Sequence, residues 1–383
     1  MYLQLATEFM LPDLLGRYIT NSHIEPVLEA LKNNNKICIE GKSVLEKNIY
    51  SIKIGTGKTK ILLWSQMHGN ESTTTKGLFD FINFLQSDDV NASEIKENYT
   101  LLCIPILNPD GATLYTRENA NNIDLNRDAF SVTQPESLLL RKLYLQFKPD
   151  FCYNLHDQRT IFGTENSKLP ASMSFLSPSY SNECEFNDVR LKAVEIINKI
   201  HNALNVYIPN QIGRFDDAFN INCVGDYFTN QGTPTILFEA GHYKQDYQRE
   251  EVRKFVFISL VSSLLKAGSQ NDINKNLDYY LNIPQNSKYF FDFIYRNVTV
   301  SSHKDNKIIN FAAQFREELV DNKINFVAEI IQIDTLNDFI GHLDYDCKRM
   351  VFDSKYGNLP IINKKADFKL NNMLKCSNGL LNL

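Results

Sequence analysis

The feature that most constrains the fold is a set of short, uninterrupted apolar runs that alternate with segments of helical periodicity. These runs are residues 60–67 (KILLWSQM), 99–107 (YTLLCIPIL), 151–156 (FCYNLH) and 234–240 (PTILFEA). Residues 77–85 (GLFDFINFL), between the first two runs, place their apolar side chains at the spacing of a helix. Continuous apolar strands are typical of a sheet that is covered on both faces. The pattern therefore predicts an α/β fold in which helices pack on both sides of the sheet.

The character of the chain changes near residue 268. Residues 267–276 are polar, and the rest is rich in aromatic and β-branched segments such as 289–295 (YFFDFIY) and 324–333 (INFVAEIIQI). We predict an α/β domain over residues 1–268, which carries the candidate site, and a small, strand-rich domain over residues 277–383.

The composition argues against some classes of protein. The 383 residues carry a net charge of −5, which argues against a nucleic-acid-binding surface. No run of about 18 apolar residues is present, so no membrane span is expected. The N-terminus lacks a basic stretch followed by a long apolar core, and the seven cysteines are scattered without a Cys-x-x-Cys pair. We therefore predict a cytoplasmic protein with reduced cysteines and no signal peptide.

Candidate chemical groups stand at the carboxyl end of each apolar run. His68 follows the first run and residues 108–111 (NPDG) follow the second, whereas His156 ends the third and Glu239 lies near the end of the fourth. Because open α/β sheets bind ligands at the carboxyl edge of their strands, we expect these groups to lie close together. Asp157, directly after His156, is expected to point away from the site and to orient a neighbouring group.

His68, Glu71 and His156 form a set of ligands that suits a catalytic zinc ion. Two imidazoles and one carboxylate leave a fourth position open for water, whose pKa the metal lowers towards neutrality. The spacing of His68 and Glu71 lets both face one point across a strand-to-helix turn, and Gly69 is predicted to allow that turn. Glu239 is a candidate to accept a proton from the water. Each residue alone is typical of an ordinary surface or core position, but their joint occurrence at strand ends favours a metal site.

A polar segment over residues 108–128 (NPDGATLYTRENANNIDLNRD) supplies further candidates. Arg117, beside a metal, can stabilise the negative charge that develops on a carbonyl oxygen. Asn126 and Arg127 can hold a substrate carboxylate, because the guanidinium fork of arginine matches carboxylate geometry. This set of residues is consistent with hydrolysis of an amide bond near a free carboxylate.

Together these motifs resemble the zinc carboxypeptidase family, peptidase family M14. The similar stretches, in the order of the family, are HGNE (68–71), NPDG (108–111), RENANNIDLNRD (117–128), NLHDQ (154–158) and FEAG (238–241). The resemblance implies a mixed, mostly parallel sheet with helices on both faces. It also implies a metallocarboxypeptidase that acts on peptides with a free carboxylate.

The resemblance further implies a role for each site residue. One zinc ion would be bound by His68, Glu71 and His156, the scissile carbonyl would be polarised by Arg117, the substrate carboxylate would be held by Asn126 and Arg127, and the general base would be Glu239.

One departure from the family leaves the substrate open. Family carboxypeptidases usually carry a substrate-binding Tyr a little over twenty residues before the general base, where this chain has residues 216–219 (DDAF). Tyr227 is closer to Glu239 in the sequence and is interpreted as a packing residue, unless a shifted loop brings it into the site.

Two alternatives remain. HGNE with DLNR also resembles the deacylase branch of succinylglutamate desuccinylase and aspartoacylase, which cleaves N-acyl amino acids and carries a smaller strand-rich C-terminal domain. In such an enzyme Arg214 is a candidate for binding a second substrate carboxylate. The other alternative is a non-catalytic binding module, which would be expected to lose the metal ligands or the base. Metal content discriminates this last class from the hydrolases.

Overall fold

The computed structural model describes residues 1–383 apart from 33, 166, 266–272, 302–304 and 383. The described chain divides into two compact units, Met1–Gln158 with Thr164–Asn286, and Arg159–Gly163 with Ser287–Leu383. The predicted domains, 1–268 and 277–383, stay a prediction, since most of the polar segment between them lies outside the described residues. Helix α10 (Ile273–Leu281), which follows that segment, is grouped with the first unit.

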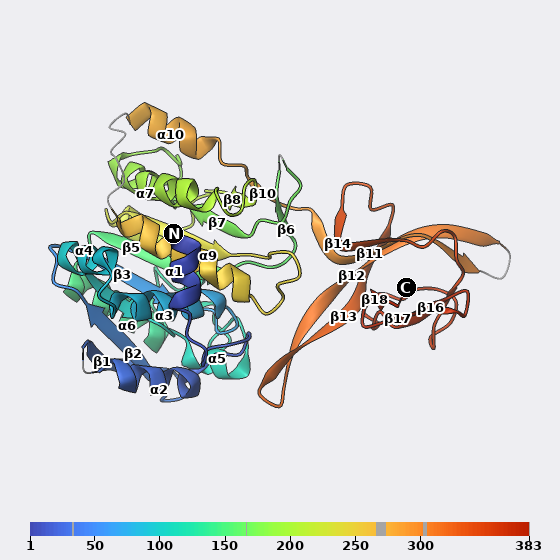
Figure 1. Cartoon of the computed structure of the whole chain (residues 1–383), viewed down its shortest axis with the longest axis horizontal. Helices are drawn as coiled ribbons and strands as arrows, with labels where there is room; N and C mark the ends of the chain where they lie inside the picture. Colours follow the sequence, from blue (N-terminus) through green and yellow to red (C-terminus); the bar gives the residue numbers. More distant parts are fainter. Residues whose placement is uncertain (33, 166, 266–272, 302–304, 383) are drawn as a thin grey trace. The chain divides into compact units, whose positions relative to one another are not determined.

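The first unit is built on an eight-stranded sheet in the order β1-β2-β4-β3-β5-β9-β7-β8 (Figure 1). Its strands are β1 (Lys36–Lys42), β2 (Asn48–Ile54), β3 (Thr59–Ser65), β4 (Tyr99–Ile104), β5 (Phe151–Asp157), β7 (Met173–Leu176), β8 (Ile212–Arg214) and β9 (Thr235–Ala240). The four predicted apolar runs form β3, β4, β5 and β9, which are neighbours and run parallel. Strands β1 and β2 and the pairing of β7 with β9 add antiparallel edges. The sheet is therefore mixed with a parallel centre, as predicted.

Helices cover both faces of this sheet. They are α1 (Tyr2–Glu8), α2 (Asn21–Leu31), α3 (Thr73–Leu85), α4 (Val90–Asn98), α5 (Pro109–Leu114), the short 3-10 helix η1 (Leu125–Arg127), α6 (Pro135–Phe147), α7 (Asp188–Leu204), α8 (Val224–Asn230), α9 (Glu250–Leu264) and α10. Successive residues of β3 enter different cores. Ile61 and Leu63 pack with α3, α7 and α9, whereas Leu62 and Trp64 pack with α6 and α8. This two-sided burial explains why the strand is apolar at consecutive positions.

The second unit is rich in strands, as predicted. Its two four-stranded sheets have the orders β13-β12-β11-β14 and β15-β16-β17-β18. The strands are β11 (Phe290–Ser301), β12 (Asn306–Val320), β13 (Lys323–Asp334), β14 (Ile340–Asp346), β15 (Phe352–Asp353), β16 (Phe368–Leu370), β17 (Leu374–Ser377) and β18 (Leu380–Leu381), and β6 (Phe162–Thr164) pairs separately with β10 (Asn286–Lys288). The core of this unit contains an aromatic cluster, in which Tyr295, Phe311 and Phe368 contact one another.

Across the described parts of the chain, no helix combines the length and the apolar character that crossing a bilayer requires. The predicted absence of a helical membrane span agrees with this finding. The cytoplasmic location stays a prediction.

Candidate active site

The candidate residues gather at the carboxyl ends of three neighbouring strands. His68 and Glu71 lie in the loop that joins β3 to α3, and His156 lies near the end of β5. In the parallel pairing of β5 with β9, His156 is directly opposite Glu239. The sheet order β3-β5-β9 therefore brings together groups that are up to 171 positions apart in the chain, as the position of the strand ends predicted.

The three predicted metal ligands face one point. Their ligand atoms all lie within 4.8 Å of one another, and within the described residues they are the one such group of three that could hold a metal ion. Nδ1 of His68 lies 2.8 Å from Oε1 of Glu71, and Nδ1 of His156 lies 2.8 Å from Oε2 of the same carboxylate. The two Nδ1 atoms are 3.1 Å apart. Two imidazole nitrogens bound tetrahedrally to one zinc ion would be about 3.3 Å apart, given Zn–N bonds of about 2.0–2.1 Å. The residues therefore fit a zinc ion.

Asp124 is a functional neighbour of the site that the sequence did not single out. Its Oδ1 lies 3.0 Å from Nε2 of His68, on the side of the ring that faces away from the other ligands. A metal-binding His commonly donates its second N–H to such an acceptor, which fixes the tautomer and the orientation of the ring. Asp124 precedes η1 and also accepts a hydrogen bond from the backbone N–H of Asn126 at 2.8 Å. In the sequence Asp124 is visible only as the Asp of the DLNR motif, and the fold is needed to identify His68 as its partner.

The charges of this cluster support one another. Burial alone would raise the pKa of Glu71, but the imidazoles of His68 and His156 outweigh it and hold the pKa of that carboxyl well below its usual range. Burial likewise disfavours the imidazolium form of His68, yet Glu71 and Asp124 raise the pKa of His68 above its usual value. For His156 burial dominates, and its pKa is lowered. The site thus combines an ionised carboxylate with nitrogen ligands, a donor set that a divalent cation neutralises.

Arg117 lies at the edge of the cluster. Its Nη1 donates to Oε1 of Glu71 at 3.2 Å, and its Nε donates to Oδ2 of Asp124 at 3.1 Å. The side chain is 41% exposed, so part of the guanidinium is accessible to solvent. Its position beside the ligands is the one expected of a group that stabilises an oxyanion.

Glu239 is partly buried at the strand end, and its buried Oε2 has no hydrogen-bond partner among the described residues. Burial, together with the neighbouring carboxyl groups of Glu71 and Asp157, raises the pKa of Glu239 well above its usual value. A carboxyl with a raised pKa and a buried, unpartnered oxygen, beside the candidate metal ligands, is typical of a catalytic acid or base. The carboxylate of Asp157 accepts from the backbone N–H groups of Thr73 and Thr74 at 2.9 and 3.2 Å. It thereby caps the start of α3.

Asn126 and Arg127 lie on η1, next to Asp124. Oδ1 of Asn126 accepts from the backbone N–H of Val224 at 3.0 Å, which anchors η1 to the start of α8. Arg127 is exposed, and its Nη1 donates to the backbone carbonyl of Asn126 at 2.9 Å. The exposed guanidinium is accessible to a charged group in solution.

Gly69 lies in a turn between His68 and Glu71, as predicted, and the backbone N–H of Glu71 donates to the carbonyl oxygen of His68 at 3.1 Å. The backbone of Gly69 does not adopt a positive φ; among the residues of this loop, Gln66 does so, with φ +46°. Gly69 is required because the chain passes so close to α5 that an added Cβ would lie 1.9 Å from the carbonyl carbon of Gly111. The missing Cβ of Gly69 therefore lets the HGNE loop touch the backbone of α5.

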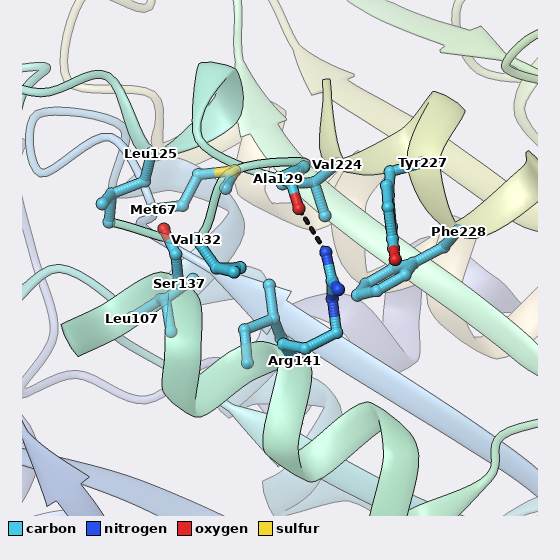
Figure 2. A pocket seen from close by; sticks show the side chains of 11 residues that line it. Met67, Leu107, Leu125, Ala129, Val132, Ser137, Arg141, Val224, Tyr227 and Phe228 are labelled. Carbon is cyan, nitrogen blue, oxygen red and sulfur yellow. Dashed lines mark hydrogen bonds between the residues drawn. The ribbon is translucent and has the colours of Figure 1, made fainter. Parts of the chain in front are cut away.

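Tyr227 faces a separate pocket. The centroid of its ring lies 3.9 Å from the guanidinium carbon of Arg141, and both side chains line a small pocket with Met67 and Ser137 (Figure 2). The interpretation of Tyr227 as a packing residue agrees with this position.

Arg214 is hydrogen-bonded to Gln285. In the orientation of the Gln285 amide that satisfies its hydrogen bonds, the amide oxygen of Gln285 accepts from the two Nη atoms of Arg214 at 2.9 and 3.0 Å.

Comparisons with known proteins agree with this geometry. Residues 22–208 match the family model of zinc carboxypeptidases. Carboxypeptidase SOL1 of Arabidopsis thaliana is 33% identical over 132 residues, which cover 30% of this chain and 26% of the relative. Carboxypeptidase 2 of Trichophyton tonsurans is 26% identical over 105 residues, which cover 27% of this chain and 20% of the relative. The chain thus spans only a fifth to about a quarter of the length of these curated relatives.

Solved structures show the same fold. The metallo-carboxypeptidase from Burkholderia cenocepacia superposes with a TM-score of 0.51 at 18% identity, over 64% of this chain and 68% of that one. Carboxypeptidase A from Helicoverpa armigera superposes with a TM-score of 0.52 at 15% identity, over 73% of this chain and 79% of that one. The family model over residues 22–208 and the shared fold support the zinc carboxypeptidase family for this region of the chain.

Proposed function

We propose that this protein is a zinc-dependent hydrolase that cleaves an amide bond next to a substrate carboxylate, and that it acts as a metallocarboxypeptidase. The observation that carries the proposal is the meeting of His68, Glu71 and His156 beside Glu239, across the neighbouring ends of β3, β5 and β9. The carboxypeptidase names of the relatives point in the same direction.

The proposed chemistry begins with the ligands. His68, Glu71 and His156 would hold one zinc ion, which would polarise the substrate carbonyl and lower the pKa of the attacking water. Asp124 would keep His68 in the tautomer whose Nδ1 is free of a proton, because it accepts the N–H of Nε2.

Glu239 would act as the general base. In the protein chain alone its raised pKa favours the protonated form. The charge of a bound divalent cation would favour the carboxylate form, so the base would be ready only in the metal-loaded site. The carboxylate would take a proton from water during the attack and pass it to the leaving amine.

Arg117, Asn126 and Arg127 would bind the substrate. Arg117 would direct its half-exposed guanidinium at the developing oxyanion while Asp124 holds its Nε. Arg127 would bind the free carboxylate with its planar fork, and Asn126 would assist it. The substrate would then be a peptide, or less favourably an N-acyl amino acid, with a free carboxylate. The deacylase alternative loses one candidate contact, because Arg214 is paired with Gln285.

The test compares the zinc-loaded protein with Glu239→Gln on a panel of peptides with free C-termini, the same peptides amidated, and N-acyl amino acids. We expect cleavage of the free-carboxylate peptides by the wild type, and a loss of at least about 100-fold in kcat in the variant with zinc retained. Glu46→Gln, at an exposed turn, is the matched control. Full activity of Glu239→Gln would refute the assigned base, and cleavage of N-acyl amino acids alone would replace the peptidase with the deacylase.

A further inference from the structure

Gln66 has a conformation that needs an explanation. It lies between the end of β3 and His68, is fully buried, and has a φ of +46°. A residue other than glycine adopts such a left-handed backbone at a cost in free energy, and it persists only where the surroundings hold it. Strained residues of this kind cluster at functional sites, so the contacts of Gln66 bear on the metal-binding loop.

One side-chain amide ties both sides of that loop. Nε2 of Gln66 donates to the backbone carbonyl of Gly69 at 2.8 Å, directly after His68. Its Oε1 accepts from the hydroxyl of Thr75 at 2.9 Å, in the first turn of α3 and just beyond Glu71. The loop that carries two predicted ligands is therefore closed by a single buried side chain.

The same amide reaches the N-terminal segment of the chain, residues 9–20. Nε2 of Gln66 also donates to the backbone carbonyl of Ile19 at 2.9 Å. On the other side of the loop, the hydroxyl of Ser72 donates to the backbone carbonyl of Arg17 at 2.6 Å. Two carbonyls of the N-terminal segment thus hold the loop before His68 and after Glu71. This segment precedes the region that matches the family model, which begins at residue 22.

Buried charges fasten the N-terminal segment to α3 and α9. Asp80 and Arg253 form a fully buried ion pair with an N–O distance of 2.6 Å, and Oδ1 of Asp80 accepts from the backbone N–H of Leu11 at 2.8 Å. Glu250, paired with Lys76 at 2.6 Å, accepts from the backbone N–H of Gly16 at 2.8 Å. Ionised groups inside a protein are held in place by their partners, so the segment has little freedom to move. Its carbonyls are therefore fixed points for Gln66 and Ser72.

We infer that Gln66 is a positioning residue for the metal site, and that residues 9–20 belong to that site because they anchor Gln66 and Ser72. The inference rests on the proposed zinc site. If it is correct, the hydrogen bonds of Gln66 and Ser72 set the geometry of the loop and thereby the affinity for zinc. Their loss should then weaken zinc binding by more than the loss of stability alone explains.

The test is the zinc affinity of Gln66→Met, measured by competition with a chromophoric chelator. Methionine keeps the length and volume of glutamine but removes its donors and acceptor. Changes to groups that orient metal ligands commonly weaken metal binding by about 10- to 100-fold, and we expect a loss in this range. Cobalt substitution adds a second measurement, since the visible absorption bands of cobalt report ligand geometry and should change in the variant.

The control is Leu204→Ala. Leu204 is fully buried at the end of α7 and takes no part in the hydrogen bonds described above. It should lower the melting temperature while leaving zinc affinity and the cobalt spectrum unchanged. If Gln66→Met does not fold, Ser72→Ala tests the inference instead. We expect it to weaken zinc binding several-fold while it changes the melting temperature only slightly.

The outcomes separate the two proposals. A wild-type protein that binds no zinc refutes the proposed function. A wild type that binds zinc, with variants at Gln66 and Ser72 that bind it equally well, refutes the positioning role and leaves the proposed function standing.

Discussion

Replacing Asp124 by Asn tests how the site orients its first ligand. The substitution preserves size and shape, but it removes the negative charge that lies 3.0 Å from Nε2 of His68. Burial raises the pKa of Asp124, yet His68 and Arg117 outweigh it and lower that pKa, so the group is ionised in the native protein. The imidazole is therefore paired with a full charge.

The magnitude follows from two effects. An Asn can present its NH₂ group to Nε2 of His68, which would favour the tautomer with a proton on Nδ1 and block that ligand atom. Arg117 also loses a carboxylate at 3.1 Å. Losing a carboxylate partner of a metal-binding His commonly weakens metal affinity by about 10- to 100-fold, which corresponds to about 1.4–2.8 kcal/mol.

The assay is zinc competition against a chromophoric chelator, with thermal unfolding of the metal-free proteins in parallel. Asp128→Asn is the control, because Asp128 lies in the same segment but accepts from the backbone N–H groups of Thr133 and Gln134. We expect Asp124→Asn to weaken zinc binding and Asp128→Asn to change only stability. Equal zinc affinity of Asp124→Asn and the wild type would refute the argument that this carboxylate sets the tautomer of His68.

Three further outcomes follow from the structure. Zinc at 100 times its dissociation constant should raise the free energy of unfolding by about 2.7 kcal/mol. A chelator should therefore lower the melting temperature, and an unchanged melting temperature would contradict a native zinc site. Gly69→Ala should destabilise the protein by about 2 kcal/mol or more, because the added Cβ would lie 1.9 Å from Gly111. Urea unfolding measures this change, and a neutral effect would mean that the HGNE loop can move away from α5. Burial raises the pKa of Asp226 to about 6, above its unfolded value of about 3.9, so its stabilising effect is present at pH below 4 and lost as the pH rises through 6. Asp226→Asn should therefore reduce the loss of stability between pH 4 and pH 7, by up to about 2–3 kcal/mol, and an unaltered pH profile from urea unfolding contradicts this.

The parallel strands of the first unit were predictable because their signal is local. A strand buried on both faces must be apolar at successive positions, as Leu62 and Leu63 are, and such runs are visible without any partner. The position of His68, His156 and Glu239 at the ends of these runs follows from the same pattern. Their convergence was predictable because parallel strands place their carboxyl ends along one edge.

Other parts of the site have no local signal. Asp124 is 56 positions from His68, and Gln66 takes its partners from residues 19, 69 and 75. The turn at Gly69 was predictable from the sequence, but its close contact with α5 was not, because α5 begins 40 residues later in the chain. Tyr227 and Arg214 could not be placed from the sequence, since their neighbours Arg141 and Gln285 are remote in the chain.

The amino-acid sequence by itself determined which segments become the strands of the parallel centre and which residues stand at their ends, since backbone pairing and burial leave a periodic trace in the chain. The tertiary structure alone decided which strand lies beside which, which carboxylate contacts which imidazole, and that the N-terminal segment accepts hydrogen bonds from Gln66 and Ser72. These contacts join residues far apart in the chain, and no short stretch of sequence carries the information that they will meet.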